Sequence, residues 1–323
     1  MDKNKAVVFA LTSSIDLAKE MCEHSGLELG KCEVTHFADG EILVQLDETV
    51  RGKDVFIVQS TCCPVSSTLM EILICIDACK RASAKSITVV MPYYGYARQD
   101  RKARPRQPIT AKLVADLLEA AGATRAVTME LHASQIQGFF DIPADDISAM
   151  CIIGNYFTER GFVNDDVVVV SPDHGGTSRA RRLAKMLNCP LAIIDKRRPK
   201  PNVAEAMNLV GDVSGKRAIV IDDIVDTAGT LMAGIDMLYA QGATEVYTAC
   251  VHGVLSGPAI ERIKNSRIVE FVCTNTIDQT QKAGNLDKMT VLSVGKVLAS
   301  TIERIEDGES VSDMLKSFNY SNS

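Results

Sequence analysis

The stretch AIVIDDIVDTAGTL, residues 218–231, is the most informative part of the sequence. Its apolar start predicts a buried strand, which ends at the adjacent carboxylates Asp222 and Asp223. A short loop of threonine and glycine follows and leads into a predicted helix over residues 231–239. In an open α/β sheet, ligands bind beyond the carboxyl ends of the strands. We therefore expect a ligand site at this strand-to-helix turn.

The residue types of this turn suit a phosphorylated sugar. Backbone N–H groups at a helix start, helped by the hydroxyls of Thr227 and Thr230, can hold a dianionic phosphate. Asp222 and Asp223 can accept hydrogen bonds from vicinal sugar hydroxyls. The simpler alternative is a capped helix beside two solvated acids. The whole string, matched to strand, loop and helix, favours the phosphate and sugar site.

The rest of the chain alternates short β-branched runs with amphipathic stretches of helical length, which predicts parallel sheets covered by helices. The expected strands are residues 54–59, 86–91, 125–131, 167–171 and 217–221, and the expected helices include 66–81 and 109–121. The predicted fold class is α/β, with two related domains that each contain a mainly parallel sheet flanked by helices.

Two short internal repeats support two related halves. The 323 residues are enough for two α/β domains with separate cores. One repeat relates Ala120, Gly122, Ala123, Thr124, Thr128 and His132 to Ala240, Gly242, Ala243, Thr244, Thr248 and His252. The other relates Val50, Gly52 and Lys53 to Val213, Gly215 and Lys216. The two offsets differ, so the halves carry different insertions and do not form a solenoid. We predict an N-terminal domain over residues 1–149 and a C-terminal domain over 150–323.

Composition excludes several classes of protein. A net charge of −6 disfavours nucleic acid and anionic membranes as partners. No apolar run reaches the length of a membrane helix, and the first twenty residues do not resemble a signal peptide. The ten cysteines form neither a CxxC pair nor a zinc pattern, which favours a reducing, cytoplasmic location. No GxGxxG turn follows the first strand, so a dehydrogenase is set aside.

Residues 220–231 resemble the phosphoribosyl-diphosphate binding loop shared by phosphoribosyltransferases and ribose-phosphate diphosphokinases. Further segments resemble the diphosphokinases over nearly the whole chain. The resemblance implies transfer of the β,γ-diphosphate of ATP to the C1 hydroxyl of ribose 5-phosphate, with AMP as the other product, in nucleotide biosynthesis. It places ribose 5-phosphate on Arg198, Asp222, Asp223, Asp226, Thr227, Ala228, Gly229 and Thr230.

Two segments of the N-terminal half are similar to the family's ATP-binding parts. The segment YYGYARQD, residues 93–100, implies that Arg98 and Gln99 contact ATP, and four basic residues follow it within residues 101–106. A guanidinium can bind phosphate oxygens in pairs or stack on adenine. The segment FADGE, residues 37–41, implies that Asp39, Gly40 and Glu41 contact the adenine of a neighbouring subunit. Without the resemblance, the simpler interpretation of the first segment is a solvated basic loop, and that of the second is an acidic turn.

The resemblance also implies a metal and a catalytic loop. The family's magnesium residues match His132 and Asp173, and a hard cation that prefers oxygen suits Asp173 directly and His132 through water or phosphate. Glu130 stands where an aspartate is often found, so it is not assigned to the metal. Lys196 and Arg198 match the catalytic cations of a closing loop, which would stabilise the transition state. Asp222 or a metal-bound hydroxide are the options for a general base.

Three hypotheses about the function remain open from the sequence alone. A phosphoribosyltransferase would share the loop at 222–230 but would not need the Arg98 segment or the doubled domain. A noncatalytic regulatory homologue would be expected to lose the Lys196 and Arg198 pair. The diphosphokinase reading implies a homo-oligomer, a hexamer in the family, with allosteric phosphate or ADP between subunits. The matching residues are Thr49, Arg51, Ser83, Arg106, Ser310 and Ser312.

Overall fold

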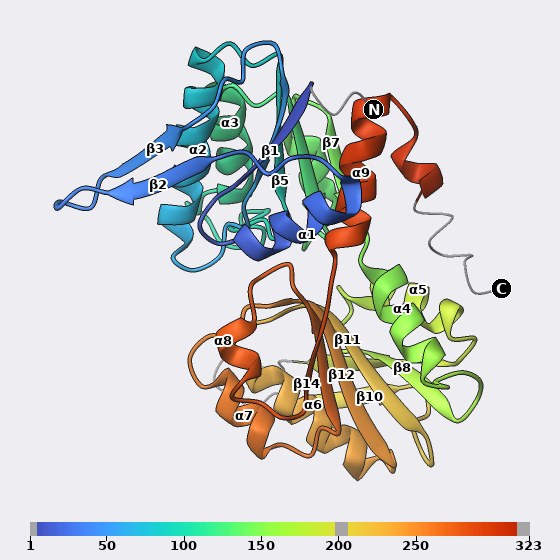
Figure 1. Ribbon diagram of the computed structural model, residues 1–323. Helices are drawn as coiled ribbons and strands as arrows, with labels where there is room; N and C mark the ends of the chain where they lie inside the picture. Colours follow the sequence, from blue (N-terminus) through green and yellow to red (C-terminus); the bar gives the residue numbers. More distant parts are fainter. Residues whose placement is uncertain (1–4, 198–205, 315–323) are drawn as a thin grey trace. The chain divides into compact units, whose positions relative to one another are not determined.

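The chain folds into two compact units, each of which has its own sheet. The computed structural model describes residues 5–197 and 206–314 (Figure 1). The first unit holds the described residues of Met1–Ser148, Thr276–Asp278 and Ser293–Ser317, and the second holds Ala149–Asn275 and Gln279–Leu292. Residues 293–314, which the sequence-based division placed in the C-terminal domain, thus pack with the first unit. The functional division at residue 149 stays a prediction.

The first unit is built on a parallel sheet of five strands in the order β1-β4-β5-β6-β7. Helices α1 and α9 pack together, as do α2 and α3, and the β2–β3 hairpin packs on α2 and projects beyond the sheet (Figure 1). The elements are β1 Ala6–Ala10, α1 Ile15–Ser25, β2 Cys32–His36, β3 Ile42–Leu46, β4 Asp54–Val58, α2 Val65–Arg81, β5 Ser86–Met91, α3 Thr110–Ala121, β6 Arg125–Met129, the 3₁₀ helix η1 Ser134–Phe139, β7 Ala144–Ile147 and α9 Gly295–Asp307.

The second unit is built on a sheet of seven strands in the order β10-β9-β8-β11-β12-β13-β14. Among the described strands of this sheet, only β10 runs antiparallel to its neighbour. The elements are α4 Met150–Glu159, β8 Val167–Ser171, α5 Thr177–Met186, β9 Leu191–Arg197, β10 Ala206–Val210, β11 Arg217–Val225, α6 Gly229–Ala240, β12 Glu245–Gly253, α7 Ala259–Asn265, β13 Glu270–Thr274, α8 Thr280–Ala283 and β14 Met289–Leu292.

The first sheet is parallel and the second mainly parallel, as predicted from the alternation of strands and helices in the sequence. Strands β4, β8 and most of β5 are buried along their length, as expected for strands covered on both faces. The two-domain α/β prediction is therefore confirmed, and each unit has its own apolar core. Among the described residues, no helix is long and apolar enough to cross a bilayer.

The internal repeats correspond to equivalent local structures. Gly122 follows α3 and Gly242 closely follows α6, both with positive φ, which only glycine adopts without strain. Gly52 and Gly215 have φ of 70° and 72°, and each lies in a tight turn directly before a strand. The amide N–H of Gly52 donates to Ser83 O, and that of Gly215 donates to Gly242 O, both at 2.9 Å. Each turn thus ties the start of one strand to the end of a helix or its following loop.

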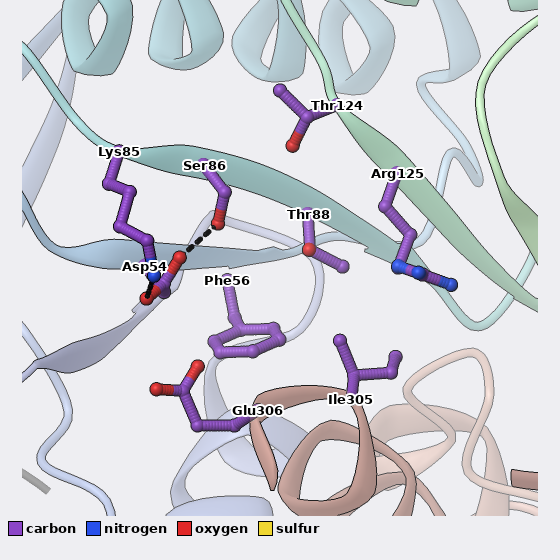
Figure 2. Close-up of a pocket in the computed structure, with 9 residues that line it drawn as sticks. All are labelled: Asp54, Phe56, Lys85, Ser86, Thr88, Thr124, Arg125, Ile305 and Glu306. Carbon is purple, nitrogen blue, oxygen red and sulfur yellow. Dashed lines mark hydrogen bonds and ion pairs between the residues drawn. The ribbon is translucent and has the colours of Figure 1, made fainter. Parts of the chain in front are cut away.

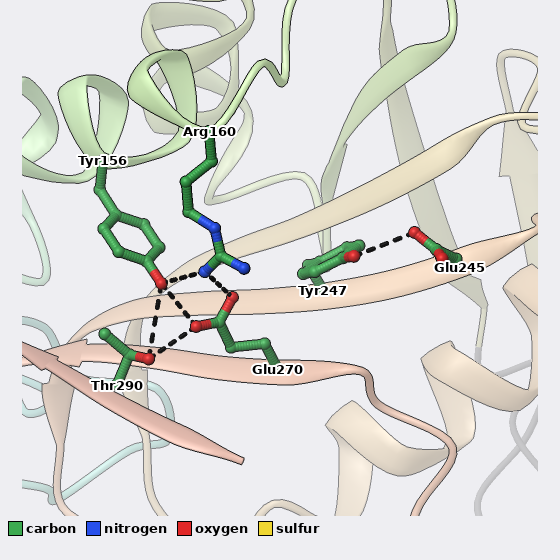
Figure 3. A network of polar contacts seen from close by, with 6 residues as sticks. All are labelled: Tyr156, Arg160, Glu245, Tyr247, Glu270 and Thr290. Atoms are coloured by element: carbon green, nitrogen blue, oxygen red, sulfur yellow. Dashed lines mark hydrogen bonds and ion pairs between the residues drawn. The ribbon is translucent and has the colours of Figure 1, made fainter.

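A polar network holds the amino-end edge of the second sheet together (Figure 3). Glu270, the first residue of β13, accepts hydrogen bonds from Tyr156 Oη at 2.5 Å, Thr290 Oγ1 at 2.6 Å and Arg160 Nη1 at 2.6 Å. Desolvation alone would raise the pKa of Glu270, but these hydrogen bonds together lower it. The network joins α4 to β13 and β14 at the edge opposite the expected ligand site, so we assign it to stability.

Candidate functional site

The predicted phosphate loop lies between β11 and α6. Strand β11 pairs with β12 as far as Val225 but with β8 only as far as Val220. The sequence predicts that this strand ends at residue 221, and the structure extends it by four residues because β12 is equally long and remains paired with it. Asp222 and Asp223 therefore lie on an extended strand beyond the last residue that pairs with β8.

The loop after β11 has a constrained backbone. Ala228 has φ of 59°, in the left-handed region that is unfavourable for a residue with a side chain. Its carbonyl accepts from the Met232 amide at 3.1 Å, and α6 begins at Gly229, two residues earlier than predicted. Arg262 Nη1 donates to Thr227 O at 2.8 Å. Strain of this kind is common where a loop is shaped for a ligand, and the first amides of a helix have no acceptor within that helix.

Arg179 is a site residue that the sequence analysis missed. It comes from the first turn of α5, and its buried guanidinium lies 3.3 Å from Asp223 Oδ1 and 3.8 Å from Asp222 Oδ1. The Asp223 side chain is also buried, whereas 31% of the Asp222 side chain is exposed. Asp222 is therefore the carboxylate of the pair that a ligand can reach. A helix rich in arginine was the only available signal, because no local pattern links residue 179 to residues 222 and 223.

Asp222 holds its proton more tightly than an ordinary aspartate. Its pKa is raised well above the usual value, first by desolvation and then by the neighbouring charge of Asp223, while Arg179 acts in the opposite direction. The amide of Asp223 donates to Asp222 Oδ1 at 2.9 Å. The more distant charge of Asp173 adds to the rise in pKa. The site therefore gathers negative charge, which suits hydroxyl donors and cations.

Asp173 lies at the end of the adjacent strand β8. Its side chain is exposed, its Oδ1 accepts from the Gly176 amide at 2.9 Å, and Ser171 Oγ donates to its carbonyl at 2.7 Å. An oriented, solvent-facing carboxylate is a suitable Mg²⁺ ligand, because this ion keeps several waters and uses few protein oxygens. Among the described residues, no group of three or more histidine, cysteine or acidic side chains forms a ready metal cage.

His174 and Asp195 connect the ends of β8 and β9. His174 Nε2 lies 3.0 Å from Asp195 Oδ1. Asp195 directly precedes Lys196, whose backbone lies in β9 opposite Met207. Arg198 lies outside the described residues. The contact therefore links the Asp173 loop to the strand from which the predicted catalytic segment leaves.

The predicted ATP residues follow β5 and β6 in the first unit. Arg98 and Gln99 are exposed at the end of a loop whose Tyr94 hydroxyl donates to Ala111 O at 2.8 Å. Gln99 Oε1 accepts from Thr110 Oγ1 at 2.6 Å, so this amide oxygen also helps to fix the start of α3. Gly95 is required here, because a Cβ would come within 2.4 Å of Thr61 O.

His132 is exposed after β6, the strand beside β5. Glu130 is buried, with φ of 43°, and accepts from Ser148 Oγ at 2.9 Å. Arg98, Gln99 and His132 thus lie in the loops that follow the neighbouring strands β5 and β6.

The remaining predicted ATP residues form the tip of the β2–β3 hairpin. Asp39, Gly40 and Glu41 are exposed, and Gly40 has φ of 93°. The Glu41 amide donates to Asp39 Oδ1 at 3.1 Å, which orders the turn. The hairpin projects beyond the five-stranded sheet of the first unit, so its tip lies away from that sheet (Figure 1). The structure therefore confirms a turn, while its contact with adenine stays a prediction.

The first unit also contains a polar hollow of about 280 Å³ at the amino ends of β4, β5 and β6 (Figure 2). Asp54 is bound to Lys85 at 2.7 Å and to Ser86 Oγ at 2.6 Å, and Arg125 is bound to Asp145 at 2.6 Å. Asp54, Lys85 and Arg125 thus each have an oppositely charged partner. This hollow lies at the edge of the sheet opposite the predicted ATP residues, and we do not assign it to the reaction.

A strand-to-helix loop that follows paired carboxylates, at the carboxyl edge of a mainly parallel sheet, defines an α/β protein of phosphoribosyltransferase-like type. A family model described as the N-terminal domain of ribose phosphate pyrophosphokinase matches residues 6–122. A second, described as the phosphoribosyl synthetase-associated domain, matches residues 170–316. The chain belongs to the ribose-phosphate pyrophosphokinase family.

Individual relatives match almost from end to end. A ribose-phosphate pyrophosphokinase of Fusobacterium nucleatum is 55% identical, covering 96% of this chain and 98% of its own. One of Bacillus caldolyticus is 59% identical, covering 94% and 96%. The crystal structure of phosphoribosylpyrophosphate synthetase from Mycobacterium smegmatis is 42% identical, with a TM-score of 0.89 over 94% of this chain and 99% of that one.

Proposed function

We propose that this chain transfers the β,γ-diphosphate of ATP to the C1 hydroxyl of ribose 5-phosphate, producing AMP and 5-phosphoribosyl 1-diphosphate. The observation that carries the proposal is the β11–α6 loop with the Asp222, Asp223 and Arg179 cluster, in a chain that matches pyrophosphokinases over nearly its full length. The doubled domain and the Arg98 segment separate this reading from a phosphoribosyltransferase.

In this proposal the sugar is held by its two ends. The first amides of α6 and the hydroxyls of Thr227 and Thr230 bind the 5-phosphate, which favours the positive end of the helix dipole. Asp222 accepts from a ribose hydroxyl, while Asp223 is held behind it by Arg179. Fixing both ends of the sugar orients the C1 hydroxyl before it reacts. The entropy cost of positioning is then met on binding, which lowers the activation barrier of the transfer step.

The reaction forms a bond from the C1 oxygen to the β-phosphorus and breaks the bond from that phosphorus to the oxygen bridging to the α-phosphate. The C1 hydroxyl loses a proton, and AMP leaves with the bridging oxygen. Arg98 and Gln99 hold ATP, with the tip at Asp39, Gly40 and Glu41 supplied by another subunit. Lys196 and Arg198 stabilise the charge that develops on the moving phosphoryl group.

The oxygen chemistry of Asp173 fits Mg²⁺, and we propose His132 as a contact to its water or to phosphate. When bound, the ion would neutralise phosphate charge and orient the phosphates for displacement. We further propose a cytoplasmic homo-oligomer. All ten cysteines lie in the described part of the chain, and each of them is a free thiol. A reducing compartment would keep them in this form.

The test is to incubate the purified protein with ATP, Mg²⁺ and ribose 5-phosphate and to follow AMP and the diphosphorylated sugar by chromatography and ³¹P spectroscopy. We expect equal amounts of the two products and none without ribose 5-phosphate. Formation of a nucleoside monophosphate from 5-phosphoribosyl 1-diphosphate and a nucleobase, without AMP formation from ATP, would instead establish a phosphoribosyltransferase. No turnover, with both substrates still bound, would indicate a regulatory homologue.

A further inference from the structure

Three successive backbone carbonyls, at the end of β11 and in the loop that follows it, accept hydrogen bonds from one later segment of the chain. These are the carbonyls of Val225, Asp226 and Thr227. The first two accept from the amides of Leu255 and Ser256, at 3.0 Å each. The third accepts from Arg262 Nη1, on helix α7, at 2.8 Å. We call residues 255–262 the clasp, because this segment holds the loop along one side.

The three hydrogen bonds also orient the amides of the loop. A trans peptide is planar, so the N–H of each residue points opposite to the carbonyl of the residue before it. The carbonyls of residues 225–227 are directed at the clasp, and the amides of residues 226–228 are therefore directed away from it. Ala228 then adopts the left-handed conformation, with φ of 59° and ψ of 6°. Such a residue is typical of turns in which successive amides gather around an anion.

The start of the clasp is itself anchored by two side chains of the α8 region. Gln279 is buried directly before α8, and its Nε2 donates to Gly253 O at 2.7 Å. Lys282 Nζ donates to Val254 O at 2.8 Å. Leu255 has φ of 49°, so the backbone turns sharply at the first residue of the clasp. The clasp is therefore a fixed support for the phosphate loop.

Arg262 contributes the side-chain hydrogen bond of the clasp. Two of the three bonds come from backbone amides, which most substitutions leave in place, whereas the third depends on the identity of this residue. Arg262 is exposed on α7, and its Nη1 lies 3.2 Å from the position that a Cβ on Gly229 would occupy. The guanidinium thus contacts the loop on both sides of Ala228. Its bond to the Thr227 carbonyl is charge-assisted, which makes it stronger than a bond between neutral groups.

We propose that Arg262 is a positioning residue for the 5-phosphate of ribose 5-phosphate. This inference rests on the proposed function for the identity of the ligand. Arg262 acts through the Thr227 carbonyl and does not touch the reacting atoms. Because the 5-phosphate keeps its charge throughout diphosphate transfer, its contacts are equally strong in the substrate and in the transition state. Losing Arg262 should therefore weaken ribose 5-phosphate binding and raise its KM, with little change in kcat.

The experiment compares Arg262→Gln, which removes the charge, with Arg262→Lys, which keeps the charge and a donor. Calorimetry with ribose 5-phosphate and, separately, with ATP and Mg²⁺ measures binding. We expect Arg262→Gln to weaken ribose 5-phosphate binding by about tenfold, as for the loss of one charged hydrogen bond, and to leave ATP binding unchanged. Its kcat at saturating ribose 5-phosphate should stay within about twofold of the parent.

Two further variants and measurements serve as controls. Arg262→Lys should recover most of the lost affinity, because a single bond to a carbonyl does not need the guanidinium fork. Lys264→Gln, at an exposed position of the same helix, should bind both substrates as the parent does. A circular dichroism spectrum that matches the parent shows that each variant is folded. In the unliganded protein, the amides of residues 226–232 should exchange faster in Arg262→Gln, while those of β8 keep their rates.

The results separate this role from the proposed reaction. Parent affinity for ribose 5-phosphate in Arg262→Gln would overturn the role of Arg262 and leave the proposed function standing. An equal loss of ATP and ribose 5-phosphate binding, or no recovery in Arg262→Lys, would also overturn it, because either result indicates a general disturbance of the fold. A parent protein that does not bind ribose 5-phosphate would count against the proposed function and this role together.

Discussion

The guanidinium of Arg179 lies 3.3 Å from Asp223 Oδ1, and both side chains are buried at the carboxyl edge of the second sheet. A buried ion pair of this kind adds little net stability, but losing one partner leaves an uncompensated charge. Here one guanidinium nitrogen faces two acids, because Arg179 Nη1 also lies 3.8 Å from Asp222 Oδ1. Arg179 is therefore the counter-charge that allows the two carboxylates to occupy neighbouring positions.

Arg179→Gln should destabilise the protein and weaken ribose 5-phosphate binding together. We expect a loss of about 3 kcal/mol in the free energy of unfolding, typical of breaking a buried pair, because both acids would then repel each other without compensation. Denaturant unfolding and calorimetry with ribose 5-phosphate measure the two effects. Arg181→Gln, at an exposed position on the same helix, is the matched control. If both variants behave alike, Arg179 does not support the site.

Asp222→Asn should stabilise the protein while reducing its activity. Because the native pKa of Asp222 is raised, the native state holds a proton that the unfolded chain releases above about pH 4. The contribution of Asp222 to stability is thus largest below the unfolded pKa and is lost as pH rises through the native pKa. We expect the midpoint of thermal unfolding of Asp222→Asn at pH 8 to rise by about 2 °C or more, with a smaller gain at pH 5. A lower midpoint at pH 8 than the parent would contradict this account.

The part of the site that sequence predicts best is its backbone. The β-branched runs and the glycine stops determine strands and helix ends locally, so residues 86–91 and 167–171 match β5 and β8 in full. The β11–α6 turn is local in the same sense, since strand, loop and helix follow one another directly.

The contacts that sequence could not predict join distant parts of the chain. The approach of Arg179 to Asp223 depends on how α5 packs against the sheet, which no local pattern specifies. The length of β11 depends on its partner β12. Likewise, α9 has an ordinary amphipathic sequence, and only its packing on α1 places it in the first unit.

Gly229→Val should weaken ribose 5-phosphate binding while leaving ATP binding largely unchanged. A Cβ at this position would lie 3.2 Å from Arg262 Nη1, and a branched side chain would also block the approach of a phosphate to the first amides of α6. We expect a loss of affinity for ribose 5-phosphate on the order of tenfold, about 1.4 kcal/mol. Asp226→Asn should act in the same direction.

The matched control for that substitution is Gly284→Ala, because a Cβ there would meet no atom within 4 Å. Calorimetry of each variant with each ligand separates the effects. Equal weakening of ATP and ribose 5-phosphate binding in Gly229→Val would point to a general disturbance of the fold and away from a phosphate loop.

Lys196→Ala should lower kcat much more than it weakens either substrate. We expect a fall in kcat of about a hundredfold or more, because a charge aimed at the transferring phosphoryl group acts mainly in the transition state. Steady-state kinetics with binding measurements test this, with Lys185→Ala on an exposed position of α5 as the control. Arg198→Lys should also be impaired, since an ammonium does not reproduce the guanidinium fork. An effect confined to KM would remove Lys196 from the catalytic group.

The last prediction concerns regulation by phosphate at the turns before β4 and β5. Arg51 Nη1 donates to Ser83 Oγ at 3.1 Å, and Ser83 has φ of 64°, so the two residues that the family resemblance assigned to a regulatory phosphate are adjacent. The Gly52 amide donates to Ser83 O, which holds the two turns together at the sheet edge opposite the predicted ATP residues. A phosphate there could replace the Ser83 hydroxyl as the partner of the Arg51 guanidinium and form a stronger, charge-assisted pair.

We expect inorganic phosphate to raise activity by about fivefold or more and ADP to inhibit beyond competition with ATP, as coupling between separate sites requires. Arg51→Ala should reduce both responses and leave the basal rate close to that of the parent, while Lys31→Ala, at an exposed position of the same unit, should retain them. Purely competitive inhibition by ADP in both variants, with no dependence on phosphate, would eliminate the regulatory site and leave the catalytic assignment intact.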